Sequence, residues 1–292
     1  MDDLDPRGRT IAIVGTGEMG AAVGSRLRVM GARVLTTLKG RSAASAQRVK
    51  RAGLEVVDDD DRLVHAAGFI LSIVPPGEAA AVADRFRAVL GRTQRKPVFV
   101  ECNAISPVTV RGIAESLASS GCPFIDAGII GGPPPAGRVD KGPRFYASGA
   151  EGNRLVILRN YGLDIMIIDG PIGAASGLKM VYAGLTKGMI ALGAAMMVGA
   201  SRDGLASALR DELARSQPDL LAWLTPRVPD MFRKAYRWVD EMGQIAEFVG
   251  SAGAGAAIYE GAARLYAQVS ADQEKYGDQS ESRRAVRSFL GR

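Results

Sequence analysis

A glycine-rich turn near the N-terminus constrains the fold of this chain more than any other feature. The segment "IAIVGTGEMG" places Gly15, Gly17 and Gly20 in a G-x-G-x-x-G pattern, directly after a β-branched run and at the start of a helical pattern. Such glycines allow a tight turn, close approach of the backbone to a pyrophosphate and close packing of helix on strand. The positive end of the helix favours phosphate. We therefore predict a dinucleotide site contacted by the whole turn: Gly15, Thr16, Gly17, Glu18, Met19 and Gly20.

Strand and helix patterns alternate through the first half of the chain, from Thr10 to about Asp169. The strand-like runs are TIAIV, RVLTT, LEVV, FILSIV, PVFVEC, PFIDA, RFYASG and DIMIID. Alternation at this spacing predicts an α/β fold of the Rossmann type, a doubly wound parallel sheet with helices on both faces. We assign residues 1–169 to this cofactor-binding domain.

The second half of the chain contains only helical patterns. They cover residues 173–199, 202–216, 219–232, 233–249 and 256–275. We therefore predict an all-α C-terminal domain over residues 170–292, with roles in substrate binding and dimerisation. The polar tail from Gly277 is expected to be loose.

Composition restricts the class of protein. A chain of 292 residues with 47% hydrophobic and 23% charged residues is long enough for two globular cores. The two cysteines, Cys102 and Cys122, lack metal-ligand spacing, and the acidic, polar N-terminus does not resemble a signal peptide. We expect a cytoplasmic protein without a metal site.

Two further features bear on possible partners. The formal net charge of +6 comes from scattered basic residues, so it indicates no nucleic-acid surface and is compatible with a polyanionic cofactor. The apolar run Met189–Ala200 is shorter than a membrane span and is flanked by Lys187 and Arg202. We expect a buried helix there and no membrane partner.

The end of the second strand decides which dinucleotide is expected. NAD enzymes place an Asp or Glu there to bind the ribose hydroxyls. This chain reads "VLTTLKGRS", which offers Lys39, Arg41 and Ser42 and no carboxylate. Two cations and a hydroxyl suit a 2′-phosphate, so we predict NADP(H) rather than NAD(H). The alternative is that Lys39 and Arg41 belong to a solvated turn.

Two later loops follow strands of the same predicted sheet and should border the same crevice, because ligands of doubly wound sheets bind at the carboxyl ends of the strands. The first loop, "SIVPPGEA", offers Val74, Pro75 and Pro76 as a rigid wall against the ribose on the adenine side. The second, "ECNAISP", offers Asn103, which we expect to reach the nicotinamide.

Five motifs together resemble one family. In order, they are GTGEMG, VPPGEA, ECNAISP, DAGIIGG and GLKMVYAG. Their order and spacing resemble the β-hydroxyacid dehydrogenase and 6-phosphogluconate dehydrogenase superfamily over nearly the whole chain. The helical half is similar to a branch with a divergent phosphogluconate-dehydrogenase-like C-terminal domain.

The resemblance implies roles for individual residues. The catalytic lysine of the family falls on Lys179, and the glycine-rich segment that starts at Asp126 would hold the substrate through the amides of Gly131 and Gly132. A desolvated lysine has a lowered pKa, so it can exchange a proton with a carbonyl or alcohol oxygen while the nicotinamide exchanges hydride. Trp238 is a further candidate for the substrate site.

The chain also departs from the family pattern. Relatives carry Asn one turn after the lysine, whereas this chain has Tyr182 and Ala183; Tyr182, at i+3 from the lysine, could replace the missing amide as a catalytic hydrogen-bond donor. Ile130 stands where relatives have Ser, and Asp240 and Glu241 stand where a Lys-Asp pair is usual. Anchors for a small acid are therefore reduced.

These departures favour a bulky, uncharged carbonyl or alcohol as the small-molecule substrate. The nearby aromatic residues could line such a pocket or could form the helical core: Trp223, Phe232, Tyr236 and Trp238. Two other functions stay open, an imine reductase and a catalytically silent dinucleotide-binding protein. Glycine- and alanine-rich helices in the second half predict a homodimer, since such surfaces would leave apolar patches on a monomer.

Overall fold

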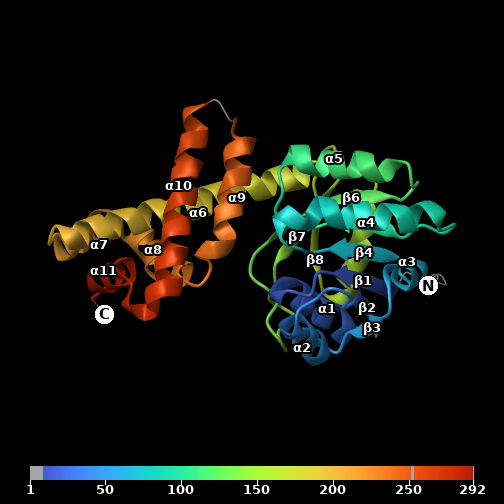
Figure 1. Cartoon of the computed structure of the whole chain (residues 1–292). Helices are drawn as coiled ribbons and strands as arrows, with labels where there is room; N and C mark the ends of the chain where they lie inside the picture. The colour runs from blue at the N-terminus through green and yellow to red at the C-terminus, as the bar shows by residue number, and fades with distance from the viewer. Residues whose placement is uncertain (1–8, 251–252, 292) are drawn as a thin grey trace. The chain divides into compact units, whose positions relative to one another are not determined.

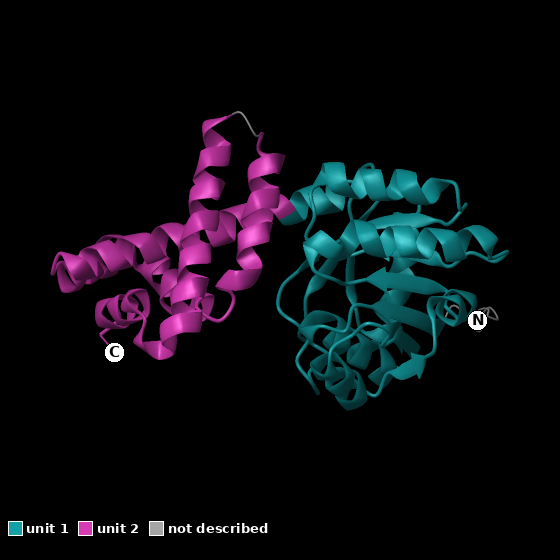
Figure 2. Ribbon diagram, viewed as in Figure 1, with its two compact units in different colours: residues 1–179 teal, residues 180–292 magenta. Residues whose placement is uncertain are grey.

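The computed structural model describes residues 9–250 and 253–291. The chain forms two compact units, Met1–Lys179 and Met180–Arg292, which Figure 2 shows in two colours. The predicted boundary lay between residues 169 and 170. The division between the units lies inside a long helix, α6 (Ala174–Arg202), rather than in the loop before it. Each unit is therefore described by itself.

The first unit is built on one eight-stranded sheet with the order β3-β2-β1-β4-β5-β6-β7-β8. The strands are β1 (Thr10–Val14), β2 (Arg33–Thr37), β3 (Glu55–Val57), β4 (Phe69–Ser72), β5 (Val98–Glu101), β6 (Phe124–Ile130), β7 (Arg144–Ser148) and β8 (Asp164–Ile167). The sheet reverses its strand order between β1 and β4, which is where ligands of such sheets bind. The predicted Rossmann fold class is confirmed.

One strand runs against the others. Strand β7 pairs antiparallel with β6, through partners such as Ala127 and Ala147, and parallel with β8. The connection from β6 to β7 is a loop without a crossover helix, as an antiparallel pair permits. The loop follows the glycine-rich segment, and it brings Ser148 beside Asp126 in the sheet.

Helices cover both faces of the sheet (Figure 1). The five residues of β1 are all buried because alternate side chains enter opposite cores: Ile11 and Ile13 on one face, Ala12 and Val14 on the other. The first face carries α1 (Glu18–Val29), α2 (Ala43–Ala52) and the 3-10 segment η3 (Gly152–Tyr161). The second face carries α3 (Asp60–Ala66), α4 (Ala79–Arg92) and α5 (Pro107–Ala118), with the short η2 (Pro76–Glu78) before α4.

The second unit is helical throughout its described residues. Beyond the continuation of α6 it contains α7 (Ala206–Ser216), α8 (Pro218–Met231), α9 (Ala235–Phe248), α10 (Ala254–Tyr276), η4 (Gly277–Gln279) and α11 (Glu281–Phe289). Helices α9 and α10 pack side by side (Figure 1). The all-α prediction is confirmed.

The polar tail is ordered, so the prediction of a loose tail was wrong. Helix α11 packs against α7 and α8, and it buries Val286 and Phe289, three residues apart on one face. Spacing of three residues puts two side chains on the same side of a helix, and two apolar residues suffice to dock this short, otherwise polar segment.

Helix α6 is not buried all round, contrary to the expectation for its apolar run. One face carries exposed apolar side chains at helical spacing, including Leu185, Met189, Leu192 and Met196. By length and composition alone, α6 could cross a membrane, with a mean hydropathy of 1.5 and 33% of the apolar window buried. A single such helix is weak evidence for a membrane span, because core helices of soluble proteins share these properties.

Candidate active site

The glycine-rich turn lies at the carboxyl end of β1 and shapes a cradle. Gly15 has a φ of 94°, and a Cβ on it would lie 2.2 Å from the carbonyl oxygen of Ile73. A Cβ on Gly20 would lie 2.0 Å from the carbonyl oxygen of Gly15, so helix and turn are in contact there. Gly17 faces open space just before Glu18 begins α1. The amides at the start of α1 and an open glycine fit a pyrophosphate.

The end of β2 presents the predicted cations without a carboxylate of its own. Lys39 is exposed, and Arg41 is half-buried, with its guanidinium 3.4 Å from the carboxylate of Glu78. Ser42 caps α2, because its hydroxyl accepts a hydrogen bond from the amide of Ser45. Arg41 is thus held beside a second positive helix end, opposite one acidic side chain.

Arg48, on the following turn of α2, was not predicted from the sequence. Its Nε donates to the carbonyl of Thr16 and one terminal nitrogen donates to the hydroxyl of Ser45, both at 3.0 Å. The hydroxyl of Thr16 is buried without a hydrogen-bond partner among the described residues. The side chain of Met19 packs against the apolar core beside the sheet. The glycine-rich turn is therefore tied to α2, and the spacing of Arg48 three residues after Ser45 was the available signal.

The two loops after β4 and β5 are joined through Asn103. Its side-chain oxygen accepts a 2.6 Å hydrogen bond from the amide of Val74, and its nitrogen donates to Ser72. Asn103 is buried and braces the loop, and its contact with the nicotinamide stays a prediction. Val74 is buried against Gly15, whereas Pro75 is exposed and Pro76 half-buried.

Asp126 has a structural environment that differs from our expectation of a substrate contact. It is fully buried, and its carboxylate accepts hydrogen bonds from the amides of Gly173, Ala175 and Ser176 at 2.8–3.1 Å. The hydroxyls of Ser148 and Ser176 also donate to it, at 3.0 and 2.6 Å. Both carboxylate oxygens are used, so Asp126 anchors the start of α6 and is not available to a substrate.

Lys179 lies against the glycine-rich segment, one turn beyond this anchor. Its ammonium donates a hydrogen bond to the carbonyl of Ile129, and the side chain is half-buried. The contact depends on Gly128, because a Cβ there would lie 2.8 Å from the carbonyl oxygen of Ala175 and 3.3 Å from the Cβ of Lys179. The sequence signal for this close approach was the glycine itself, which we had not singled out.

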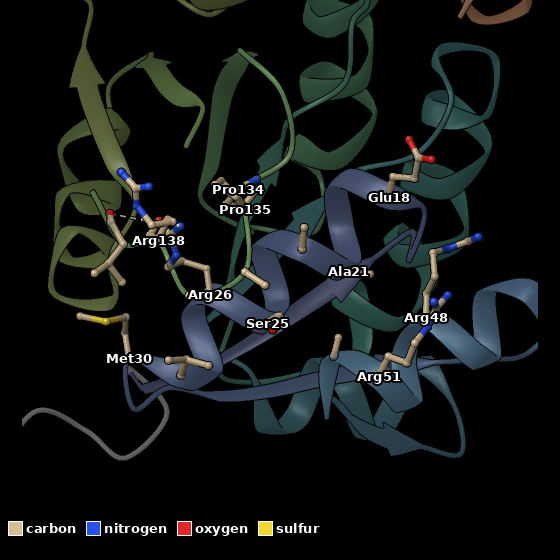
Figure 3. Close-up of a pocket in the computed structure, with 16 residues that line it drawn as sticks. Glu18, Ala21, Ser25, Arg26, Met30, Arg48, Arg51, Pro134, Pro135 and Arg138 are labelled. Carbon is tan, nitrogen blue, oxygen red and sulfur yellow. Dashed lines mark hydrogen bonds between the residues drawn. The ribbon is translucent and has the colours of Figure 1, made fainter. Parts of the chain in front are cut away.

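The loop after the glycine-rich segment is held by an arginine that the sequence analysis also missed. Gly131 and Gly132 are exposed, and Gly131 has a φ of 123°. Arg26 of α1 is buried against this loop and lines a groove of about 710 Å³ (Figure 3). Its guanidinium donates to four carbonyls, those of Arg138, Val139, Lys141 and Gly162. The groove's arginine therefore serves to fix the loop.

Glu101, at the end of β5, is a second buried carboxyl group beside Asp126. Burial, with a smaller contribution from the charge of Asp126, raises the pKa of Glu101 to about 8, so Glu101 is protonated at neutral pH. One oxygen accepts from the amide of Asn103 at 2.9 Å, and the other has no partner among the described residues. Register places Glu101 between Ser72 and Asp126 in the sheet.

The remaining predicted residues lie in the second unit. Tyr182 is half exposed on α6. Trp238 packs edge-on against Tyr266, with ring centroids 5.1 Å apart. The ammonium of Lys187 lies 5.4 Å from the ring centroid of Trp238. Lys187 also pairs with Glu241, which is buried, so the acidic residue that we read as a lost substrate anchor is neutralised within the helical unit.

The other aromatic residues divide between core and surface. Phe232 is buried in the helical core, whereas Tyr236 is 63% exposed. Trp223 is half-buried, with the guanidinium of Arg227 4.5 Å from its ring centroid. Phe232 therefore follows the core alternative that the sequence left open.

Comparison with known proteins places this arrangement in a family. Residues 10–154 match the NAD binding domain of 6-phosphogluconate dehydrogenase, and residues 200–269 match a domain of unknown function. The chain belongs to the β-hydroxyacid dehydrogenase and 6-phosphogluconate dehydrogenase superfamily, in the branch with this divergent helical domain. It is an oxidoreductase that uses a nicotinamide dinucleotide and acts on a CH–OH group.

Several individual proteins are similar to it. An uncharacterized 28.5 kDa protein of Methanothermus fervidus is 27% identical over 240 residues, which cover 82% of this chain and 90% of that protein. The 3-hydroxyisobutyrate dehydrogenase of Pseudomonas aeruginosa is 29% identical over 126 residues, 42% of this chain and 41% of the enzyme. A solved structure described as similar to 3-hydroxyacid dehydrogenases is 26% identical, covers 95% of this chain and 99% of its own, and has a TM-score of 0.69.

Proposed function

We propose that this protein is an NADPH-dependent oxidoreductase that interconverts a carbonyl compound and an alcohol, with Lys179 as general acid and base. One observation carries the proposal: the ammonium of Lys179 reaches the carbonyl of Ile129 and therefore lies beside the glycine-rich segment. A lysine in this position can donate a proton to a substrate oxygen bound at that segment. The nicotinamide supplies the hydride when the cofactor is bound.

The residues of the first unit divide the remaining work. The amides at the start of α1, with the open space at Gly17, would hold the pyrophosphate. The exposed amides of Gly131 and Gly132 would bind one polar group of the substrate. Residues 1–169 are the cofactor domain in this proposal, and the helical residues 170–292 provide substrate contacts, including Trp238, and the dimer interface.

NADPH is favoured over NADH on electrostatic grounds. Lys39 and Arg41 follow a strand that ends without a carboxylate, and Ser42 adds a hydroxyl at the start of α2. A 2′-phosphate brings about two negative charges to this place, which cations and a helix start stabilise. The nearest acidic group, Glu78, is engaged by Arg41.

The test of the proton-transfer role is Lys179→Met. We expect turnover to fall by on the order of 10²- to 10⁴-fold with the affinity for NADPH unchanged, since only a positioned acid or base is removed. Lys275→Met, a change on exposed helix surface, is the control and should leave turnover unaltered. Near-normal turnover of Lys179→Met on an authentic substrate would mean that Tyr182 or water, and not Lys179, transfers the proton.

The substrate in this proposal is bulky and uncharged. Ile130 provides no hydroxyl beside the glycine amides, and Asp240 stands where an anionic substrate would need a cation, while Glu241 is paired with Lys187. We expect ketones, aldehydes or alcohols with a sizeable apolar part to be turned over with a higher kcat/KM than 6-phosphogluconate, 3-hydroxyisobutyrate or tartronate semialdehyde. Steady-state kinetics on both groups decides this, and efficient turnover of one of the small acids would contradict it.

Two other functions are separated by the same assay. An imine reductase would consume NADPH with cyclic imines faster than with any carbonyl compound. A silent dinucleotide-binding protein would bind NADPH tightly and consume none with carbonyls, imines or hydroxy acids. Retention of Lys179 supports the carbonyl reaction over both. We further propose that the protein acts in the cytoplasm as a homodimer, without a membrane, metal or nucleic-acid partner.

A further inference from the structure

A row of buried polar residues crosses the carboxyl end of the sheet. Register pairs Ser72 of β4 with Glu101 of β5, Glu101 with Asp126 of β6, and Asp126 with Ser148 of β7. All four side chains are buried, and Asn103 continues the row to the loop after β4. The row therefore joins the loop expected beside the cofactor to the start of α6.

Two members of the row contact α6: the hydroxyl of Ser148 accepts a 3.0 Å hydrogen bond from the amide of Ala175, and the larger number of contacts is made by Asp126. Three backbone amides and the hydroxyl of Ser176 donate to its carboxylate, so it satisfies the first turn of the helix and complements its positive end. Ala175 and Ser176 precede Lys179 by four and three residues, which places them on the same helix face. The contact with Asp126 therefore sets how α6 is rotated about its axis and how far it is shifted along that axis. Both determine the position of Lys179.

We propose that Asp126 and Glu101 form a buried carboxyl pair that positions the first turn of α6, and that Asp126 is a positioning residue for the proton transfer by Lys179. The inference rests on the proposed function. In the proposed role, Asp126 touches neither substrate nor cofactor. It acts by holding the helix that presents the lysine.

The charge of the pair matters to this role. The charged and titratable groups around it are Cys102 directly after β5, Lys179 on α6 and Arg111 on α5, whose guanidinium lies next to Gly173. Asp126 faces the amides, and Glu101, which burial keeps protonated at neutral pH, adds no negative charge beside it. Ionisation of Glu101 would place two like charges on neighbouring strands, with one carboxylate oxygen unpartnered, and would weaken the anchor.

The first test is Asp126→Asn, which keeps the shape, removes the negative charge and replaces one of the two accepting oxygens by an NH2 donor. We expect kcat to fall by about tenfold to a hundredfold, because a small displacement of a catalytic group is costly, while the Kd for NADPH changes less than about twofold. The control is Asp164→Asn, an exposed carboxylate on β8 that pairs with Arg144 at 3.1 Å. An unchanged kcat in Asp126→Asn would overturn the proposal.

A second readout does not depend on activity. Competitive labelling with an amine reagent, followed by peptide mass spectrometry, gives the pH dependence of reactivity at Lys179 itself. Asp126→Asn should alter this profile at Lys179 and leave that of Lys275 in place. If Asp126→Asn does not fold, Ser176→Ala removes only the 2.6 Å hydroxyl contact, and it should change the labelling of Lys179 in the same direction by a smaller amount. Identical labelling profiles in the wild type and the folded variants would overturn the proposal.

The third test uses Glu101→Gln, which holds this position neutral at every pH. Wild-type kcat should decline as pH rises through about 8, and the variant should lose that decline while keeping its activity at pH 7. Persistence of the decline in Glu101→Gln would contradict the role of the pair. Failure of the proposed function would give a different pattern of results. Lys179→Met would then retain turnover, whereas the labelling of Lys179 in Asp126→Asn would still differ from that in the wild type.

Discussion

At the scale of single residues, three side chains have tasks that their neighbours explain. Arg26 holds a loop through three carbonyls and contacts a fourth at Gly162, Asp126 anchors a helix start and Arg41 pairs with Glu78. In each case a charged group is matched to fixed dipoles or to one opposite charge. Substitution at these positions therefore has effects whose direction can be stated.

Arg41 should determine much of the preference for NADPH. Arg41→Ala is expected to weaken NADPH binding by about tenfold or more and to leave NADH nearly unchanged, because a charge-assisted hydrogen bond contributes roughly 1.5–3 kcal/mol. Glu78→Gln should tighten NADPH binding by about twofold to fivefold, since it frees Arg41 from an exposed ion pair. Fluorescence titrations measure both, with Arg33→Ala at the other end of β2 as control. Equal losses for both cofactors in Arg41→Ala would refute the assignment.

Glu101 should make the first unit less stable as pH rises. Its pKa is about 8 in the folded chain and near its ordinary value in the unfolded chain, so between pH 4.5 and 8 the unfolded state binds fewer protons. The free energy of unfolding then falls with rising pH by up to about 1.4 kcal/mol per pH unit. Glu101→Gln should remove this slope and be more stable than the wild type at pH 7. Urea unfolding at several pH values measures it, and parallel curves for the two proteins would contradict it.

At the scale of secondary structure, most of the helices and strands follow from local patterns, and the glycines decide where they approach each other. Gly20 allows α1 to approach the glycine-rich turn closely, and Gly128 allows α6 to approach β6 closely. Gly17 is at no such contact, because it faces open space. The two kinds of glycine should respond differently to the same small substitution.

Gly17→Ala and Gly20→Ala form a matched pair. A methyl group at Gly20 would lie 2.0 Å from the carbonyl oxygen of Gly15, so we expect a loss of roughly 1–3 kcal/mol or more in the free energy of unfolding. Gly17→Ala meets no protein atom and should unfold like the wild type, but it should bind NADPH about tenfold more weakly because the methyl group occupies the cradle. Chemical unfolding and cofactor titration separate the two effects. Normal NADPH affinity in Gly17→Ala would indicate that the pyrophosphate binds at another place.

At the scale of the whole molecule, the exposed face of α6 is the feature that a monomer explains least well. Leu185, Met189, Leu192 and Met196 are all more than 40% exposed, and they lie on one side of the helix. An apolar stripe of this length is typical of a surface that another subunit covers. The stripe supports the proposed homodimer with an observation independent of the glycine and alanine content of the helices.

The double variant Leu185→Asp/Leu192→Asp should therefore be monomeric. Each leucine contributes roughly 1.5–3 kcal/mol when buried, so the dimer should be weakened by about a hundredfold or more. Light scattering coupled to gel filtration measures the mass, and Leu205→Asp, which is equally exposed but outside the stripe, is the control. A stable wild-type monomer at micromolar concentration would contradict the dimer, and a dimeric double variant would place the interface on another surface.

By itself, the sequence determined the features that depend on short stretches of backbone. The G-x-G-x-x-G turn, the alternation of strands and helices up to residue 169 and the helical second half follow from residue periods and from glycine conformations, which act over a few residues. Helix α11 was missed because its apolar signal consists of Val286 and Phe289 in a polar segment. The five motifs were sufficient to identify the family.

Only the tertiary structure decided which polar groups meet. Glu101 and Asp126 lie on neighbouring strands, Arg26 reaches a loop more than a hundred residues away, and Lys187 pairs with Glu241 across two helices. Strand order and helix packing fix these neighbours, and no local period encodes them. For the same reason the internal partners of Asn103 and Asp126 were not foreseen: a buried polar group binds whichever donors and acceptors the fold brings within about 3 Å.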